Sequence, residues 1–181
     1  MTTQRSSLAP LMGEYRDVLL DPAGRITWES GVRKNTIATD CRRLLCGFLH
    51  SGTTTALGIT GLQVGKGEAS WDQSPGAPPA LPSRTELVDP HSFTVAADAL
   101  QIDYLAGTAV SATPTNQLQV VATLGPGRPD WPDAHHSDGT LREFGLVGSL
   151  DGATVLIDYV IHPAIPRDPL STLKRTIRLV F

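Results

Sequence analysis

The segment Thr140–Phe181 decides the fold. It divides into TLREFGLVGS (140–149), LDGATVLIDYVIHPAIP (150–166) and RDPLSTLKRTIRLVF (167–181). Each part contains an apolar or alternating run, and turn residues separate the runs, which is a pattern typical of β-strands. The LDG turn predicts a hairpin between the first two strands. We expect this block to form the centre of the sheet.

The rest of the chain predicts a mainly β fold with one helix. With the C-terminal block included, the expected strands cover residues 15–20, 25–29, 57–64, 93–97, 100–104, 118–124, 141–147, 153–161 and 173–181. The helix is expected over Asn35–Leu49, where apolar residues recur at helical spacing and Asn35 or Thr36 can cap the first turn. Residues 81–88 predict a short helix or turn. These elements indicate a β-sandwich-like, mostly antiparallel fold with the helix packed on the sheet.

Two long loops interrupt this pattern. Residues 65–82 and 125–138 are rich in Pro and Gly, and each carries a single tryptophan, Trp71 or Trp131. We expect these tryptophans to fix their loops against the body of the protein or against a neighbouring chain. Residues 1–13 form a loose N-terminal arm in this interpretation.

Length and composition exclude several classes of protein. The 181 residues suit a single domain, 1–181. The net charge is −3 and the pI is about 5.9, so no basic surplus points to nucleic acid or to an anionic membrane. No apolar run approaches the ~20 residues that span a bilayer. The N-terminal sequence lacks a secretory signal, so we expect synthesis and folding in the cytoplasm.

Charge and cysteine content add two further expectations. Charged residues make up 18% of the chain, below the usual value of about 25%, as in surfaces that other subunits cover. We therefore expect a homo-oligomer. The two cysteines, Cys41 and Cys46, are five positions apart, a spacing that suits neither a disulfide nor a zinc site. Buried free thiols are the simpler interpretation.

The segment DWPDAHHSD is the strongest candidate for a metal site. Its possible ligands are Asp130, Asp133, His135, His136 and Asp138. Adjacent histidines in an extended segment point to opposite sides, however, and no third His or Cys stands at a characteristic spacing. We therefore expect a solvated loop without metal. A small metalloenzyme built on this loop remains an alternative, and it predicts stoichiometric metal in the purified protein.

No convincing catalytic set is present in the sequence. The serines do not form a G-x-S-x-G nucleophile elbow, and the glycines around Lys66 do not form a phosphate-binding loop. Arg142 and Glu143 are adjacent and so lie on opposite faces of a strand, whereas acid–base catalysis needs groups that converge. We expect a protein that is not an enzyme and that binds no cofactor.

Two segments resemble a known family. Residues 59–87 and 141–163 are similar to the N-terminal, particle-attaching domain of tail-fibre and tail-collar proteins of contractile-tailed phages and related injection systems. The residues that carry the resemblance are Val64, Gly65, Gly67, Thr85, Leu87, Arg142, Glu143, Phe144, Gly145, Leu146, Leu156, Ile157, His162 and Pro163. The last strand, Arg175–Phe181, is similar to the closing strand of that domain, and the resemblance covers about residues 35–181.

The resemblance implies a non-enzymatic structural subunit or adaptor at a baseplate, collar or cap. A tail fibre would continue into a shaft and a receptor-binding tip, whereas this chain ends at Phe181, so a fibre-tip function is not implied. The expected partners are other particle subunits. The alternative is a free-standing β-sandwich module that binds a ligand such as carbohydrate, with the tryptophans stacked on sugar rings.

Seven residues are candidates for contacts between subunits. Tryptophans are common at the centres of interfaces, and the remaining candidates come from the segments that carry the resemblance and from the end of the last strand. The candidate interface residues are Trp71, Trp131, Arg142, Phe144, His162, Pro163 and Phe181.

Overall fold

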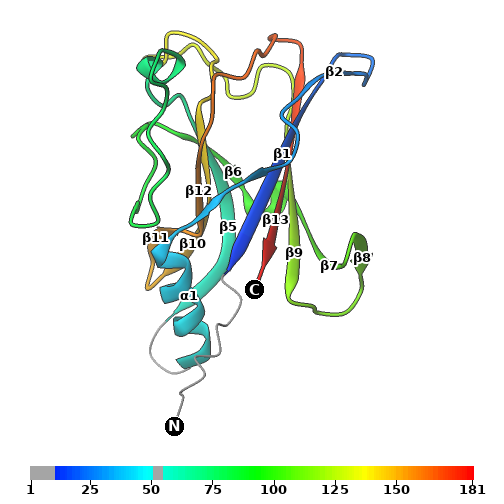
Figure 1. The fold of residues 1–181 in the computed structure, drawn as a ribbon, viewed down its shortest axis with the longest axis vertical. Helices are drawn as coiled ribbons and strands as arrows, with labels where there is room; N and C mark the ends of the chain where they lie inside the picture. Colours follow the sequence, from blue (N-terminus) through cyan, green and yellow to red (C-terminus); the bar gives the residue numbers. More distant parts are fainter. Residues whose placement is uncertain (1–10, 51–54) are drawn as a thin grey trace.

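The computed structural model describes residues 11–50 and 55–181 (Figure 1). The strands are β1 (Met12–Leu20), β2 (Ile26–Glu29), β3 (Arg33–Lys34), β4 (Thr36–Ile37), β5 (Ala56–Gly65), β6 (Phe93–Ala96), β7 (Leu100–Ala106), β8 (Ala109–Ser111), β9 (Gln117–Leu124), β10 (Glu143–Leu150), β11 (Ala153–Leu156), β12 (Asp158–Ile161) and β13 (Thr172–Val180). The helices are α1 (Thr39–His50) and two short 3₁₀ helices, η1 (Ala69–Asp72) and η2 (Ala97–Ala99). Most of the expected arm, 1–13, lies outside the described residues, and Met12 and Gly13 already belong to β1.

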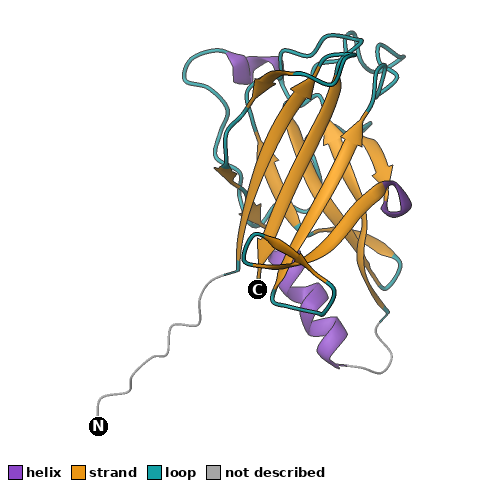
Figure 2. Cartoon of the chain, turned by 90° about the vertical axis from the view of Figure 1, so that its right-hand side faces the viewer, coloured by secondary structure: helices purple, strands orange, loops and turns teal. Residues whose placement is uncertain are grey.

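The described strands form two antiparallel sheets that pack face to face (Figure 2). Sheet 1 has the order β2-β1-β13-β9-β7-β8, with β3 also paired to β1. Sheet 2 has the order β4-β12-β10-β5-β6, with β11 also paired to β10. A hydrophobic core joins them, and within it the ring of Tyr15 from sheet 1 meets the ring of Phe144 from sheet 2 edge-on, with 5.1 Å between the ring centroids. The predicted mainly β, antiparallel fold is confirmed.

The C-terminal block holds the centre of both sheets rather than of one. β10 lies between β5 and β12, whereas β13 lies between β1 and β9. The expectation that the whole block lies in one sheet of the sandwich was wrong, because the chain crosses from sheet 2 to sheet 1 after His162, where Pro163 and Pro166 interrupt strand pairing. The predicted hairpin at 150–152 is confirmed. Asp151 and Gly152 have φ values of 51° and 81°, as a type I′ turn requires.

The predicted strand 153–161 is split into β11 and β12 by a side chain. The carboxylate of Asp158 is directed at the backbone of β10, where it accepts a hydrogen bond from the N–H of Leu146 at 2.6 Å. The backbone N–H of Ile157 donates to the carbonyl of the same leucine at 2.8 Å. A carboxylate thus replaces a backbone acceptor at the break, which alternation of residue types alone does not reveal.

The helix begins later than predicted. Residues Thr36 and Ile37 form β4 and pair with β12, and the Asn35 side chain donates to Asp158 at 2.5 Å instead of capping a helix. Pairing with a neighbouring strand therefore overrides the helical spacing at these positions. From Thr39 onward α1 packs on sheet 2 through buried residues such as Leu44. Cys41 is buried, but Cys46 is exposed, so the prediction of two buried thiols was wrong for Cys46.

The two ends of the sandwich differ in character. α1 and the C-terminus lie toward one end, and the long loops gather at the other (Figure 1). In the loop end, residues 81–88 form turns and no helix, because Glu143 and nearby carbonyls take up their backbone N–H groups. We call these the helix end and the loop end below.

Candidate functional site

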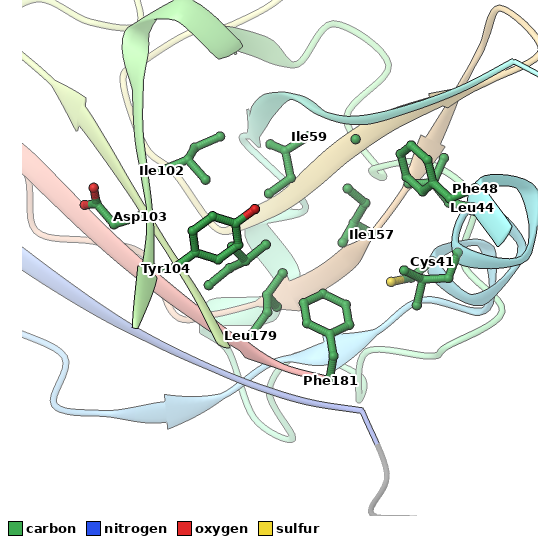
Figure 3. A pocket seen from close by; sticks show the side chains of 13 residues that line it. Cys41, Leu44, Phe48, Ile59, Ile102, Asp103, Tyr104, Ile157, Leu179 and Phe181 are labelled. Atoms are coloured by element: carbon green, nitrogen blue, oxygen red, sulfur yellow. The ribbon is translucent and has the colours of Figure 1, made fainter. Parts of the chain in front are cut away.

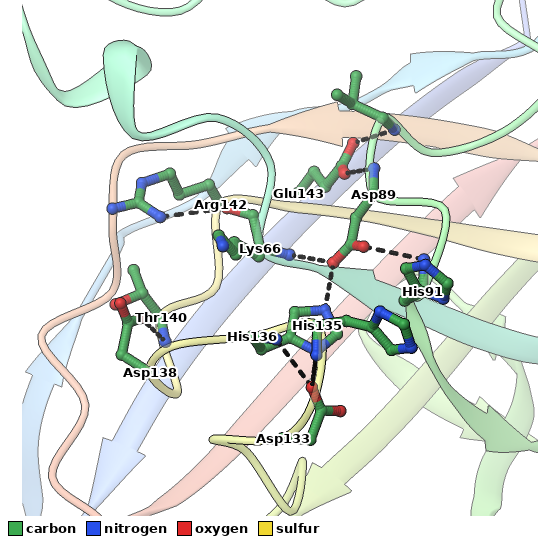
Figure 4. A network of polar contacts seen from close by, with 11 residues as sticks. Lys66, Asp89, His91, Asp133, His135, His136, Asp138, Thr140, Arg142 and Glu143 are labelled. Atoms are coloured by element: carbon green, nitrogen blue, oxygen red, sulfur yellow. Dashed lines mark hydrogen bonds and ion pairs between the residues drawn. The ribbon is translucent and has the colours of Figure 1, made fainter.

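Asp89 ties three loops together at the loop end (Figure 4). Its carboxylate accepts the backbone N–H groups of Lys66 and His91, each at 2.9 Å, and lies 3.0 Å from Nε2 of His136. Partial burial raises the pKa of Asp89, but these hydrogen bonds together lower it further than burial raises it. Asp133 contacts the other ring nitrogen, Nδ1 of His136, at 2.8 Å.

The two adjacent histidines of this loop diverge. The ring of His135 stacks on His91 at 3.5 Å, whereas the ring of His136 stacks on Trp131 at 3.7 Å. The ring centroids of His135 and His136 are 6.5 Å apart and the two ring planes are nearly perpendicular, so the nitrogens of these two histidines do not converge on one point. Within residues 11–50 and 55–181, no group of three or more His, Cys, Asp or Glu side chains could hold a metal ion.

Arg142 and Glu143 hold the loops from opposite sides of the chain. Arg142 donates two hydrogen bonds to Asp72, at 2.6 and 2.9 Å, and this pairing lowers the pKa of Asp72. Glu143 is fully buried and accepts the backbone N–H groups of Val88 and Asp89. It also accepts the hydroxyl of Tyr159 at 2.6 Å, and burial together with this carboxylate raises the pKa of that tyrosine. Both residues therefore fix loops in place.

Trp71 is buried within its own loop. Its exposed fraction is 7%, and its ring lies against Gly67. Gly67 has a φ of 56°, and a Cβ at this position would lie 2.3 Å from the indole. Glycine is therefore required twice, once for backbone conformation and once for the close approach of the ring. Trp71 therefore packs inside the loop 65–82 and holds its first turn.

Replacing Gly67 with Ala is expected to lower the free energy of unfolding by about 2–3 kcal/mol, because left-handed strain and overpacking against Trp71 add together. Gly107→Ala is the matched control, since Gly107 has a φ of 66° but a Cβ added there would meet no atom within 4 Å. That control should cost only about 1 kcal/mol. Urea unfolding of both variants measures the difference. Equal losses would show that the indole contact contributes nothing.

A buried ion pair lies between the sheets. Arg175 of β13 is fully buried and donates from Nε and Nη2 to the two carboxylate oxygens of Asp17 on β1, each at 2.7 Å. Its guanidinium lies 3.6 Å from the ring centroid of Phe144. Nη2 also lies 3.2 Å from Nε2 of His162. Because arginine only donates, Nε2 is the acceptor, and Nδ1–H donates to the carbonyl of Pro163 at 2.8 Å.

An apolar groove of about 360 Å³ opens at the helix end (Figure 3). We call it the end groove. One wall is α1, with Cys41, Leu44 and Phe48, and burial raises the pKa of the Cys41 thiol to about 11. The opposite wall is β7, with Ile102 and Tyr104, and Leu179 and Phe181 close the groove between the walls.

The surface around the end groove is unusually apolar. Large hydrophobic side chains exposed at this end include Phe48, Leu49, Ile102, Tyr104 and Phe181. Contiguous exposed apolar surface on a protein marks a site of interaction with another molecule. The end groove is therefore the candidate functional site of this chain.

The structure places the predicted interface residues in different environments. Trp71, Arg142, Phe144 and His162 are buried within the chain, where they hold loops or fill the core, so their side chains do not present a contact surface. Trp131 is half-buried against His136, and Pro163 is exposed at the loop end. Of the seven, Phe181 alone borders the end groove.

The groove residues on α1 and β7 escaped prediction. Leu100, Ile102 and Tyr104 alternate as expected for the core face of a strand, but only Leu100 is buried. A usable signal was the length of the apolar pattern. On both β7 and α1 the apolar residues continue beyond the buried part of the element, so some of them remain exposed.

No protein-family model, curated protein or solved structure matches this chain. Among the helices of the described residues, none is both long enough and apolar enough to cross a membrane.

Proposed function

We propose that this chain is a non-enzymatic structural subunit or adaptor that joins neighbouring subunits of a phage tail or contractile injection particle, at a baseplate, collar or cap position. The observation that carries the proposal is the end groove with its exposed apolar border. Phe48 is 49% exposed, Leu49 86% and Phe181 41%, all at one end of the sandwich. Surface of this kind is suited to permanent burial against another subunit.

Two further features support a structural role. The loop end is held rigid by charged side chains such as Arg142 and Glu143, whose hydrogen-bonding groups are directed into the protein. The resemblance of residues 59–87 and 141–163 to particle-attaching domains supports a phage tail or an injection particle as the assembly in which this subunit works. In this proposal the loop end keeps its shape, and the helix end supplies the apolar contact.

The carbohydrate-binding alternative has less support. It requires a tryptophan face open to a sugar ring, yet Trp71 is buried against Gly67 and one face of Trp131 is covered by His136. A second function is therefore not proposed.

The proposal is tested by locating the protein in its producing cells. An antibody raised against the purified chain is used to probe density-gradient fractions of a lysate, and the same fractions are viewed by electron microscopy. We expect the protein to sediment with tail-like or injection-like particles and the antibody to label them at a fixed position. Protein found only among slowly sedimenting material, under conditions where such particles are present, would contradict the proposal.

A further inference from the structure

We propose that the end groove is the contact between two copies of this chain, with the tip of α1 from each copy seated in the groove of the other. The inference rests on the proposed function and names one partner of the same site. Its first support is shape. Leu49, at the tip of α1, is 86% exposed, and the groove lies beside it on the same end of the sandwich.

The groove is large enough for this contact. A cavity of about 150 Å³ lined by apolar side chains holds a benzene molecule. The end groove, at about 360 Å³, has room for the side chain of Leu49 from a second copy. An apolar projection beside an apolar hollow is self-complementary. When two copies are related by a two-fold axis, each fills the groove of the other with its own Leu49, and the assembly is closed as a dimer.

Charge supplies the second support. Arg42 is exposed on α1 and lies seven residues before Leu49, two helical turns along the same face. Among the described residues, Arg42 forms no ion pair. Asp103 lies on the β7 wall of the groove, and its carboxylate is directed to the outer side of that strand, where Gln101 donates a hydrogen bond to it at 2.8 Å. When Leu49 of one copy lies in the groove of the other, Arg42 of the first copy is brought toward Asp103 on β7 of the second.

The first test is the mass of the purified full chain in solution, measured by sedimentation equilibrium over a wide range of concentrations. We expect a dimer for the native chain and a monomer for Leu49→Asp. The unfolding temperature of that variant at high dilution should match the native value, because Leu49 is exposed in the single chain. Leu170→Asp is the matched control, since Leu170 is 63% exposed in the loop between β12 and β13 and does not line the groove, and this variant should remain a dimer.

The second test exchanges charges. Arg42→Asp and Asp103→Arg each place like charges opposite each other in both halves of the dimer, so each variant alone should dimerise about tenfold more weakly. Mixing the two variants should restore dimers, because each mixed contact then pairs opposite charges. Tagging one variant allows the mixed dimer to be isolated and counted.

Two results would overturn the inference. One is a native chain that stays monomeric at every concentration, and the other is a dimer that neither Leu49→Asp nor the charge exchanges weaken. Both concern only the pairing of two copies. A monomeric chain that still sediments with particles would contradict the dimer and leave the proposed function standing. A dimer that is absent from particles would contradict the proposed function and leave the dimer standing.

Discussion

Replacing Arg175 with Met is expected to lower the free energy of unfolding by about 3–5 kcal/mol, because the carboxyl group of Asp17 would then lie in the core without its partner. The native carboxylate receives two hydrogen bonds from one guanidinium, and both side chains are buried. Methionine retains the length and apolar stem of the side chain, so the loss comes from the charge. In a domain of this size the unfolding temperature should fall by roughly 10 °C.

A double variant separates the charge from the packing. Asp17→Leu combined with Arg175→Met removes both charges, so it should recover most of the loss, since buried ion pairs can often be replaced by apolar side chains at little cost. Arg16→Met is the matched control on the same strand, because Arg16 pairs with Glu29 on the exposed face and should change stability by less than about 1 kcal/mol. A double variant no more stable than Arg175→Met would show that the pair is not held by its charges.

Replacing Asp158 with Asn is expected to stabilise the protein at pH 7–8 by about 2–3 kcal/mol. Burial raises the pKa of Asp158 from 3.8 to about 6. Between pH 3.8 and about 6 the folded chain binds a proton that the unfolded chain releases, so the contribution of Asp158 to stability falls as the pH rises. Above about pH 6 the carboxylate is charged in both states, and the full cost of burying that charge remains. An amide carries no such charge. Its oxygen can accept the N–H of Leu146, and a 180° rotation of the Asn35 amide, which now donates to Asp158, lets Oδ1 of Asn35 accept from the new amide nitrogen.

His162 has the opposite effect on stability. Burial first, and the nearby charge of Arg175 second, lower its pKa from 6.5 to about 3. Between these values the unfolded chain binds a proton that the folded chain does not, so stability falls as the pH falls, by about 1.4 kcal/mol per unit. The two slopes nearly cancel between about pH 4 and 6. We therefore expect the native chain to show weak pH dependence in that window.

Each single variant should expose the slope of the other residue. Asp158→Asn should lose stability steeply as the pH falls from 6.5, whereas His162→Gln should gain stability from pH 6 toward pH 4. Urea unfolding across pH 4–8 measures both trends. Asp98→Asn removes an exposed carboxylate and controls for the change in net charge. Parallel pH profiles for all the variants would contradict the assignment.

Much of the fold was accessible from residue patterns. The strands of the C-terminal block, the hairpin at 150–152 and the single main helix follow from alternation, turn chemistry and helical spacing, because each is decided by neighbours in sequence. The helix start at Thr39 was missed because Asn35 is held by Asp158, a residue 123 positions away. Local spacing carries no information about that partner.

The buried charges show a signal that was present but not used. Arg175 occupies an apolar position in the alternation of Leu173, Ile177 and Leu179, and Asp17 does the same between Tyr15 and Leu19. A charge in the apolar phase of a strand requires a partner of opposite sign. Two such positions would have predicted the ion pair, although not that β1 and β13 are neighbours. The apolar patterns of α1 and β7 were a signal for the end groove as well, but its position could not be predicted, because it depends on which parts of these elements the rest of the fold covers.

The pairing of β1 with β13 has a consequence for how the protein is made. Asp17 leaves the ribosome 158 residues before Arg175, so the charge and the paired edge of β1 stay uncovered until β13 has been synthesised. Contacts this distant in sequence form slowly. Premature termination between β9 and β13 would remove the middle of sheet 1 and leave β1 and β9 with open strand edges. Such fragments would be targets for aggregation and quality control.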